Sequence, residues 1–153
     1  MQKLGSNILQ LTSSKDSELS RLAWRTTNEI LGYYSTVTAI TNIQRHGPTF
    51  AIANKDAECL TVQPGADHWT FEDMVYEHCT QHLDPLLGPG AVANSLIFKN
   101  IAFKDVRVIY NGGPLKLDNV YFVNCTFELQ PSDKSKVLAE TLLASNAITL
   151  RLP

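Results

Sequence analysis

The residues best suited to chemistry in this sequence gather between positions 68 and 84. Histidine and carboxylate side chains dominate this segment, and its candidate ligand-binding residues are His68, Glu72, Glu77, His78 and His82. On a helix, His78 and His82 would share one face at the i, i+4 spacing of a metal-binding pair. In an extended strand the same two residues lie about 13 Å apart, which is too far for one ion.

The secondary structure of this segment therefore decides its chemistry. As a helix, it would start at Thr70 and turn Phe71 and Met74 toward a buried face. As a strand, it would hold Glu72 and Glu77 at outward, solvated positions rather than as the paired carboxylates of a glycosidase. The sequence assigns no catalytic residue, no metal and no cofactor, and a strand is favoured by the repeat that follows.

A pentad pattern recurs in three blocks, residues 69–83, 96–110 and 115–129. Apolar residues fill the first and third positions of every pentad except at Gln81. Side chains alternate along a strand, so these two positions point the same way. The fifth position of the first two pentads in each block is Asp, Asn or His, which suits a tight corner. Stacked about 4.8 Å apart, such blocks pair their backbones and align like residues in columns.

The repeat predicts a mainly β fold with flanking helices, namely a short right-handed parallel β-helix of three to four coils. We expect a single domain over residues 1–153. A long N-terminal helix is predicted over 14–46 from its 3.6-residue apolar period, and the coils over 50–129. A degenerate first coil would begin at residue 50, 19 residues before the first block. A short C-terminal helix and a strand complete the chain over 132–153.

A family resemblance supports this fold. The string F-V-N-C-T-F at 122–127 resembles right-handed β-helix proteins of the pentapeptide-repeat type. Residues 110–127, with LAETLLAS at 138–145, resemble small uncharacterised bacterial proteins. The resemblance covers roughly residues 69–152 and implies a fold but no activity. The chain departs from regular pentapeptide repeats because it has three pentads per coil and additional loops.

One outward column of the repeat is apolar and is the predicted interaction surface. Its members are Val75, Ala102, Tyr121 and Val123. An apolar strip on the outside of a coil should be covered by another element. We expect the helix over residues 17–44 to lie on it.

The composition excludes several classes of protein. A formal net charge of −2 argues against a nucleic-acid partner and against acidic DNA mimicry. No apolar run is long enough to span a membrane. The three cysteines, an odd and sparse count, predict reduced thiols in the cytoplasm, with Cys79 and Cys125 as small inward-facing fillers.

The sequence thus predicts a non-catalytic structural or protein-interaction module. A short stack of coils has exposed ends, and unpaired strand edges invite pairing with another chain. We expect a homo-oligomer, most simply a dimer, or a protein partner. The alternative is a small carbohydrate- or metal-binding enzyme that uses the acidic and histidine cluster at 68–84.

Overall fold

The structure is a computed structural model that describes residues 2–36, 49–51, 55–59, 68–84 and 95–153. Its helices are α1 (Gln2–Gln10), α2 (Ser17–Thr36) and α3 (Asp133–Ala144), with a short 3-10 helix at Leu11–Ser13. Its strands are β1 (Thr49–Ala51), β2 (His68–Glu77), β3 (Thr80–His82), β4 (Ser95–Lys104), β5 (Arg107–Tyr110), β6 (Leu115–Val123), β7 (Thr126–Leu129) and β8 (Ile148–Leu152). In these residues, no helix is both long enough and apolar enough to cross a membrane.

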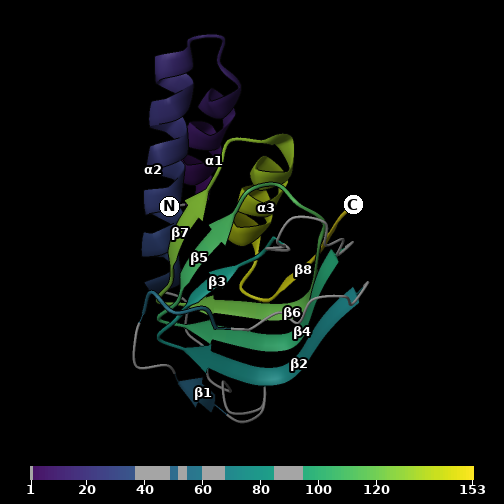
Figure 1. Ribbon diagram of the computed structural model, residues 1–153. Helices are drawn as coiled ribbons and strands as arrows, with labels where there is room; N and C mark the ends of the chain where they lie inside the picture. Colours follow the sequence, from purple (N-terminus) through teal and green to yellow (C-terminus); the bar gives the residue numbers. More distant parts are fainter. Residues whose placement is uncertain (1, 37–48, 52–54, 60–67, 85–94) are drawn as a thin grey trace.

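The strands form two sheets. The larger has the order β1-β2-β4-β6-β8 and the smaller β3-β5-β7. All neighbours pair in parallel except β8, which lies antiparallel to β6 at the edge. Each block contributes one strand to each sheet, and Figure 1 shows β2, β4 and β6 stacked in that order. The chain is therefore a mixed α/β protein with parallel strands in two sheets and helices at both ends.

The strand register confirms the block alignment. Trp69 pairs with Leu96, which pairs with Leu115. In the second pentad, Phe103 lies between Tyr76 and Phe122 in the same way; its ring centroid is 5.9 Å from that of Tyr76 and 5.4 Å from that of Phe122. The segment 69–83 is thus strand, and the helical alternative is wrong.

The corners of the repeat also form as predicted. Every non-glycine residue with a positive φ in the described chain occupies a fifth position, with φ between 51° and 61°: Asp73, His78, Asn100, Asp105, Asn119 and Asn124. Asn and Asp tolerate this left-handed conformation better than other side chains. One column of corners is linked directly, because Asn119 Nδ2 donates to Asn100 Oδ1 at 3.2 Å and Asn100 Nδ2 to Asp73 Oδ1 at 2.7 Å.

The N-terminal region differs from the single helix expected over 14–46. The chain ahead of position 14 forms α1, and it then turns back into α2 to make a helical hairpin. Asp16 caps α2 by accepting from Leu19 N at 3.2 Å, and Ser20 Oγ donates to the Thr12 carbonyl at 2.6 Å. Gly5 would put a Cβ 2.9 Å from Leu143 Cδ2, so its lack of a side chain allows α1 to approach α3. The rest of the predicted helix, 37–46, lies outside the described residues.

The C-terminal region is confirmed. Ser132 caps α3 by accepting from Ser135 N at 3.0 Å. The strand predicted at the end of the segment 132–153 is β8, whose Leu152 and Leu150 pair with Leu115 and Leu117. It covers the edge of the larger sheet that a last parallel strand would leave open.

The first coil was predicted incorrectly. Phe50 pairs with Tyr76 rather than with Trp69, so the 19-residue spacing does not hold there. Cys59 and Cys79 form a disulfide with a Cα–Cα distance of 5.1 Å, so the prediction of reduced thiols is wrong for both. Cys125 is a free and buried cysteine, as predicted.

Candidate functional site

A groove of about 870 Å³ is lined by residues of α2 and β7. Figure 1 shows these two elements side by side. Its helical wall includes Arg21, Arg25 and Gly32, and its floor includes Thr126 and Glu128. The volume is within the range of natural ligand sites. The groove is therefore the first candidate for a binding site.

Two polar side chains hold α2 against the edge of β7. Asn28 Nδ2 donates to the Leu129 carbonyl at 3.3 Å, and Leu129 N donates to Asn28 Oδ1 at 3.1 Å. Cys125 N donates to Ser35 Oγ at 2.9 Å, and the Ser35 hydroxyl lies 2.9 Å from the Cys125 carbonyl. Between them, a Cβ on Gly32 would meet the Cys125 carbonyl at 3.5 Å. The side chains of α2 thus satisfy backbone groups that an exposed strand edge would offer to another chain.

At one end of the groove, Asp105 is held as a carboxylate. His78 Nδ1 lies 3.0 Å from Asp105 Oδ2, and Lys55 Nζ donates to Asp105 Oδ1 at 3.2 Å. The hydrogen bond with His78 and, secondarily, the bond and charge of Lys55 hold the pKa of Asp105 below its usual value. A general acid or base works best with a pKa near the working pH, and this shift moves Asp105 away from it.

Other charged side chains at the groove are also paired. Arg107 binds Glu128 with two nitrogens, Nε at 2.5 Å and Nη2 at 3.1 Å, across β5 and β7. The hydrogen bond to Glu128 raises the pKa of Arg107, which stays protonated. On α2, Arg25 Nε lies 3.6 Å from Glu29 Oε1. Charges of both signs therefore line the groove, so it has no strong preference for an anion or a cation.

Cys125, at the groove floor, is not suited to nucleophilic chemistry. Its thiol is buried and donates to the Phe103 carbonyl at 3.3 Å. Burial raises the pKa of Cys125 to about 12. The thiolate is the reactive form, so this thiol is inert at neutral pH.

The structure does not bring the sequence-predicted cluster together. His68 is the first residue of β2, and Glu72 is exposed further along the same strand. Glu77 lies 3.7 Å from Lys104 on β4, and His78 pairs with Asp105.

His82, the last member of the cluster, lies apart on β3. Its Nδ1 is 2.7 Å from Glu58 Oε1, a contact without hydrogen-bond geometry. Within the described ranges, no group of three His, Cys, Asp or Glu side chains is arranged to hold a metal.

The predicted interaction surface is half buried. Val75 and Ala102 are buried, whereas Tyr121 and Val123 are partly exposed. The described part of the helix packs mainly along β7 and contacts β6 only slightly. The apolar column did not predict where the helix packs. Buried Trp24 and Leu31 join the core from α2, and Asn28 bonds the backbone of β7.

Asp84, which the sequence analysis did not single out, explains the Asn-Gly-Gly-Pro corner before β6. Its buried carboxylate accepts from Asn111 N at 2.5 Å and from Gly113 N at 2.6 Å. A Cβ on Gly113 would stand 2.8 Å from Asp84 Oδ1, so only glycine allows this approach. The corner is structural.

We expect Asp84→Asn to lower the free energy of unfolding by about 1–3 kcal/mol. The amide keeps one acceptor oxygen and turns an NH₂ group toward a backbone donor. Urea denaturation would measure the loss. Asp118→Asn, at a half-exposed position on β6, is the matched control and should change stability by less than about 0.5 kcal/mol. Equal effects of the two substitutions would show that Asp84 does not hold the corner.

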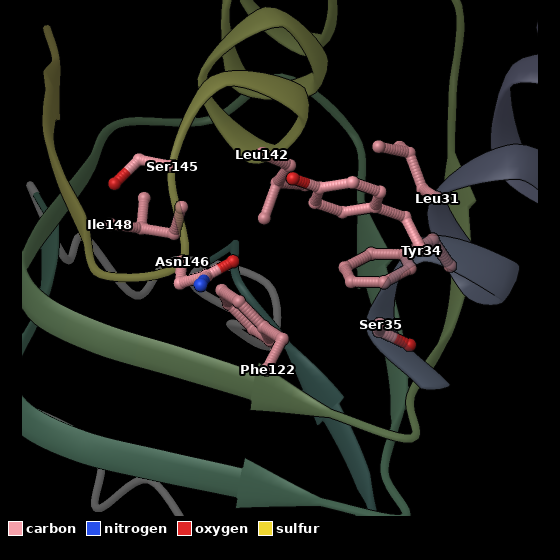
Figure 2. A pocket seen from close by; sticks show the side chains of 9 residues that line it. Leu31, Tyr34, Ser35, Phe122, Leu142, Ser145, Asn146 and Ile148 are labelled. Carbon is pink, nitrogen blue, oxygen red and sulfur yellow. The ribbon is translucent and has the colours of Figure 1, made fainter. Parts of the chain in front are cut away.

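Figure 2 shows a second, much smaller cavity between α2, α3 and β6. Leu31, Phe122, Leu142 and Ile148 line it, with Asn146 at one side. Its volume of about 20 Å³ holds roughly one water molecule. It is a packing gap beneath the helices, and the groove stays the candidate site.

Comparison of the chain with family profiles, curated proteins and solved structures gives no match.

A polar stripe on the helix could have identified the groove wall. Asn28 and Ser35 are seven residues apart, with Gly32 between them, so all three lie on one side of α2. A glycine flanked by hydrogen-bonding residues is typical of a helix face that approaches another backbone closely. The sequence alone does not say which backbone that is.

Proposed function

We propose that this protein is a short right-handed β-helix that acts as a non-catalytic protein-interaction module. The β-helix is supported by the three blocks. Each block supplies one strand to each of the two sheets, and the block strands pair in parallel. Connections between parallel strands are right-handed in about 98% of cases, which supports its handedness. The groove between α2 and β7 is the observation that carries the function.

The shape of the groove favours an extended peptide segment. Its helical wall runs from Arg21 to Thr36, which corresponds to about 22 Å of helix. An extended peptide of about six or seven residues covers that length. Tyr33 and Arg25 line the groove with exposed side chains, and Tyr and Arg are among the side chains enriched at the energetic centres of protein interfaces.

The chemistry of the groove argues against catalysis at this site. Asp105 is stabilised as a carboxylate by His78, and the thiol of Cys125 is buried with a raised pKa. Neither group is poised to exchange a proton near pH 7. Binding through paired charges and aromatic side chains is the activity that these residues support.

Peptide selection tests the proposal directly. Peptides selected from a displayed random library on the wild-type protein should bind Thr126→Arg at least about tenfold more weakly, because an arginine at this exposed floor position fills the groove. Thr70→Arg is the matched control, at an exposed strand position that does not line the groove, and should bind like the wild type. Fluorescence anisotropy measures both.

The metal-binding alternative predicts a different result, which the melting temperature in the presence of zinc would show. Zinc should leave the melting temperature unchanged. A zinc-dependent rise that His78→Ala abolishes would contradict the proposal and assign the function to the acidic and histidine cluster.

The compartment is part of the proposal. Disulfides persist in oxidising environments and are rare where thiols are kept reduced. The Cys59–Cys79 bond is buried just before β3, so an oxidising compartment suits this protein better than the expected cytoplasm.

A further inference from the structure

The helical hairpin formed by α1 and α2 exposes four leucines. The exposed fractions of their side chains are large: Leu4 54%, Leu11 42%, Leu19 38% and Leu22 57%. In the described chain, the other large exposed apolar side chains are Tyr33 and Val137. Exposed leucines are unremarkable singly, but a contiguous apolar patch marks an interaction site.

Two of these leucines share one face of α2. Leu19 and Leu22 are three residues apart, so their side chains are neighbours on the helix surface. Leu4 on α1 and Leu11 in the 3-10 helix are exposed on the same hairpin. We call Leu19 and Leu22 the leucine face.

The charges beside the leucine face are self-complementary. Lys15, just before α2, and Glu18, Arg25 and Glu29 on it are exposed and run plus, minus, plus, minus along the chain. Arg21 is exposed as well, but it lies about 100° from Leu22 around the helix. Read in the opposite direction about Leu22, the order becomes minus, plus, minus, plus. Two antiparallel copies of α2 would therefore place Glu18 of each copy opposite Arg25 of the other, and Lys15 opposite Glu29.

We propose that the leucine face binds a second copy of this chain across a two-fold axis near Leu22, with the two α2 helices antiparallel. Such an interface is isologous, since the same patch serves both subunits. A lipid surface would instead suit a flank of one sign, enriched in Lys and Arg. The leucines of this interface do not line the proposed peptide groove, whereas Arg25 and Glu29 line both. The second copy thus stands at the rim of the groove.

Sedimentation velocity on the full chain tests the apolar contact. The wild-type protein should sediment at twice the 17.0 kDa chain mass, and Leu22→Asp should sediment as a folded monomer. Val137→Asp is the matched control, since Val137 is exposed on α3, and should remain a dimer. A monomeric wild type at about 100 μM, or a dimer that persists in Leu22→Asp, would overturn the proposal.

Charge exchange tests the antiparallel arrangement. This test remains informative even if Leu22→Asp fails to fold. Glu18→Arg alone and Arg25→Glu alone should each raise the dimer dissociation constant about tenfold, because each breaks two symmetric ion pairs. The double variant should restore dimerisation. Failure to restore it would exclude this arrangement. A monomer that co-sediments with phosphatidylcholine vesicles through Leu22 would assign the face to lipid instead.

Discussion

Phe103→Ala is expected to lower the free energy of unfolding by about 3–5 kcal/mol, the largest effect of any single substitution considered. Phe103 is fully buried at the centre of the aromatic column, with Phe122 and Tyr76 stacked on either side. Its ring also meets Phe98 edge-on at 5.6 Å. Truncation would leave a cavity that rigidly paired strands cannot close, so both transfer and packing energy are lost.

Urea denaturation, followed by circular dichroism, measures this effect. Tyr33→Ala removes an aromatic side chain that is 57% exposed and should cost less than about 0.5 kcal/mol. A loss below about 1 kcal/mol for Phe103→Ala would mean that the three blocks do not stack in the observed register.

Removal of the Cys59–Cys79 disulfide is expected to cost about 3 kcal/mol. The bond closes a loop between residues 20 apart, and opening it restores chain entropy to the unfolded state. It joins the segment 55–59 to the residue before β3, where Cys59 N also donates to the Thr80 carbonyl at 2.8 Å. Cys59→Ser combined with Cys79→Ser should therefore loosen the segment 55–59 before the rest of the described chain.

Two measurements check this expectation. A reductant should lower the melting temperature of the wild type and leave that of the double serine variant unchanged. Under non-reducing, denaturing conditions, mass spectrometry should find alkylation at Cys125 alone. Alkylation of all three cysteines in freshly purified, unreduced protein would contradict the disulfide.

The sequence predicted the parts of the fold that depend on local conformation and periodic burial. A left-handed corner needs a residue such as Asn119 or Asn124, and an inward column needs an apolar residue at each level, as at Phe122. Both requirements repeat in every block. The α3 helix was predictable for a similar reason, because Ser132 caps its first turn and an apolar stripe follows.

The parts that could not be predicted depend on contacts between distant segments. Asn28 and Leu129 are 101 residues apart, and no local pattern shows that an amide will satisfy a strand edge. The first coil was misaligned because it lacks apolar pentads, although the 20-residue separation of Cys59 and Cys79 is close to one repeat. The cluster at 68–84 looked like a site because its charges are dense in the sequence, whereas its residues pair with neighbouring strands.

Amide chemical-shift mapping by NMR is the most direct test of the central claim that the groove between α2 and β7 binds an extended peptide. Titration of ¹⁵N-labelled protein with a selected peptide should produce its largest changes at Gly32, Tyr33 and Thr126, which line the groove. Changes centred on Glu72 and His82, with the groove amides unmoved, would contradict the claim.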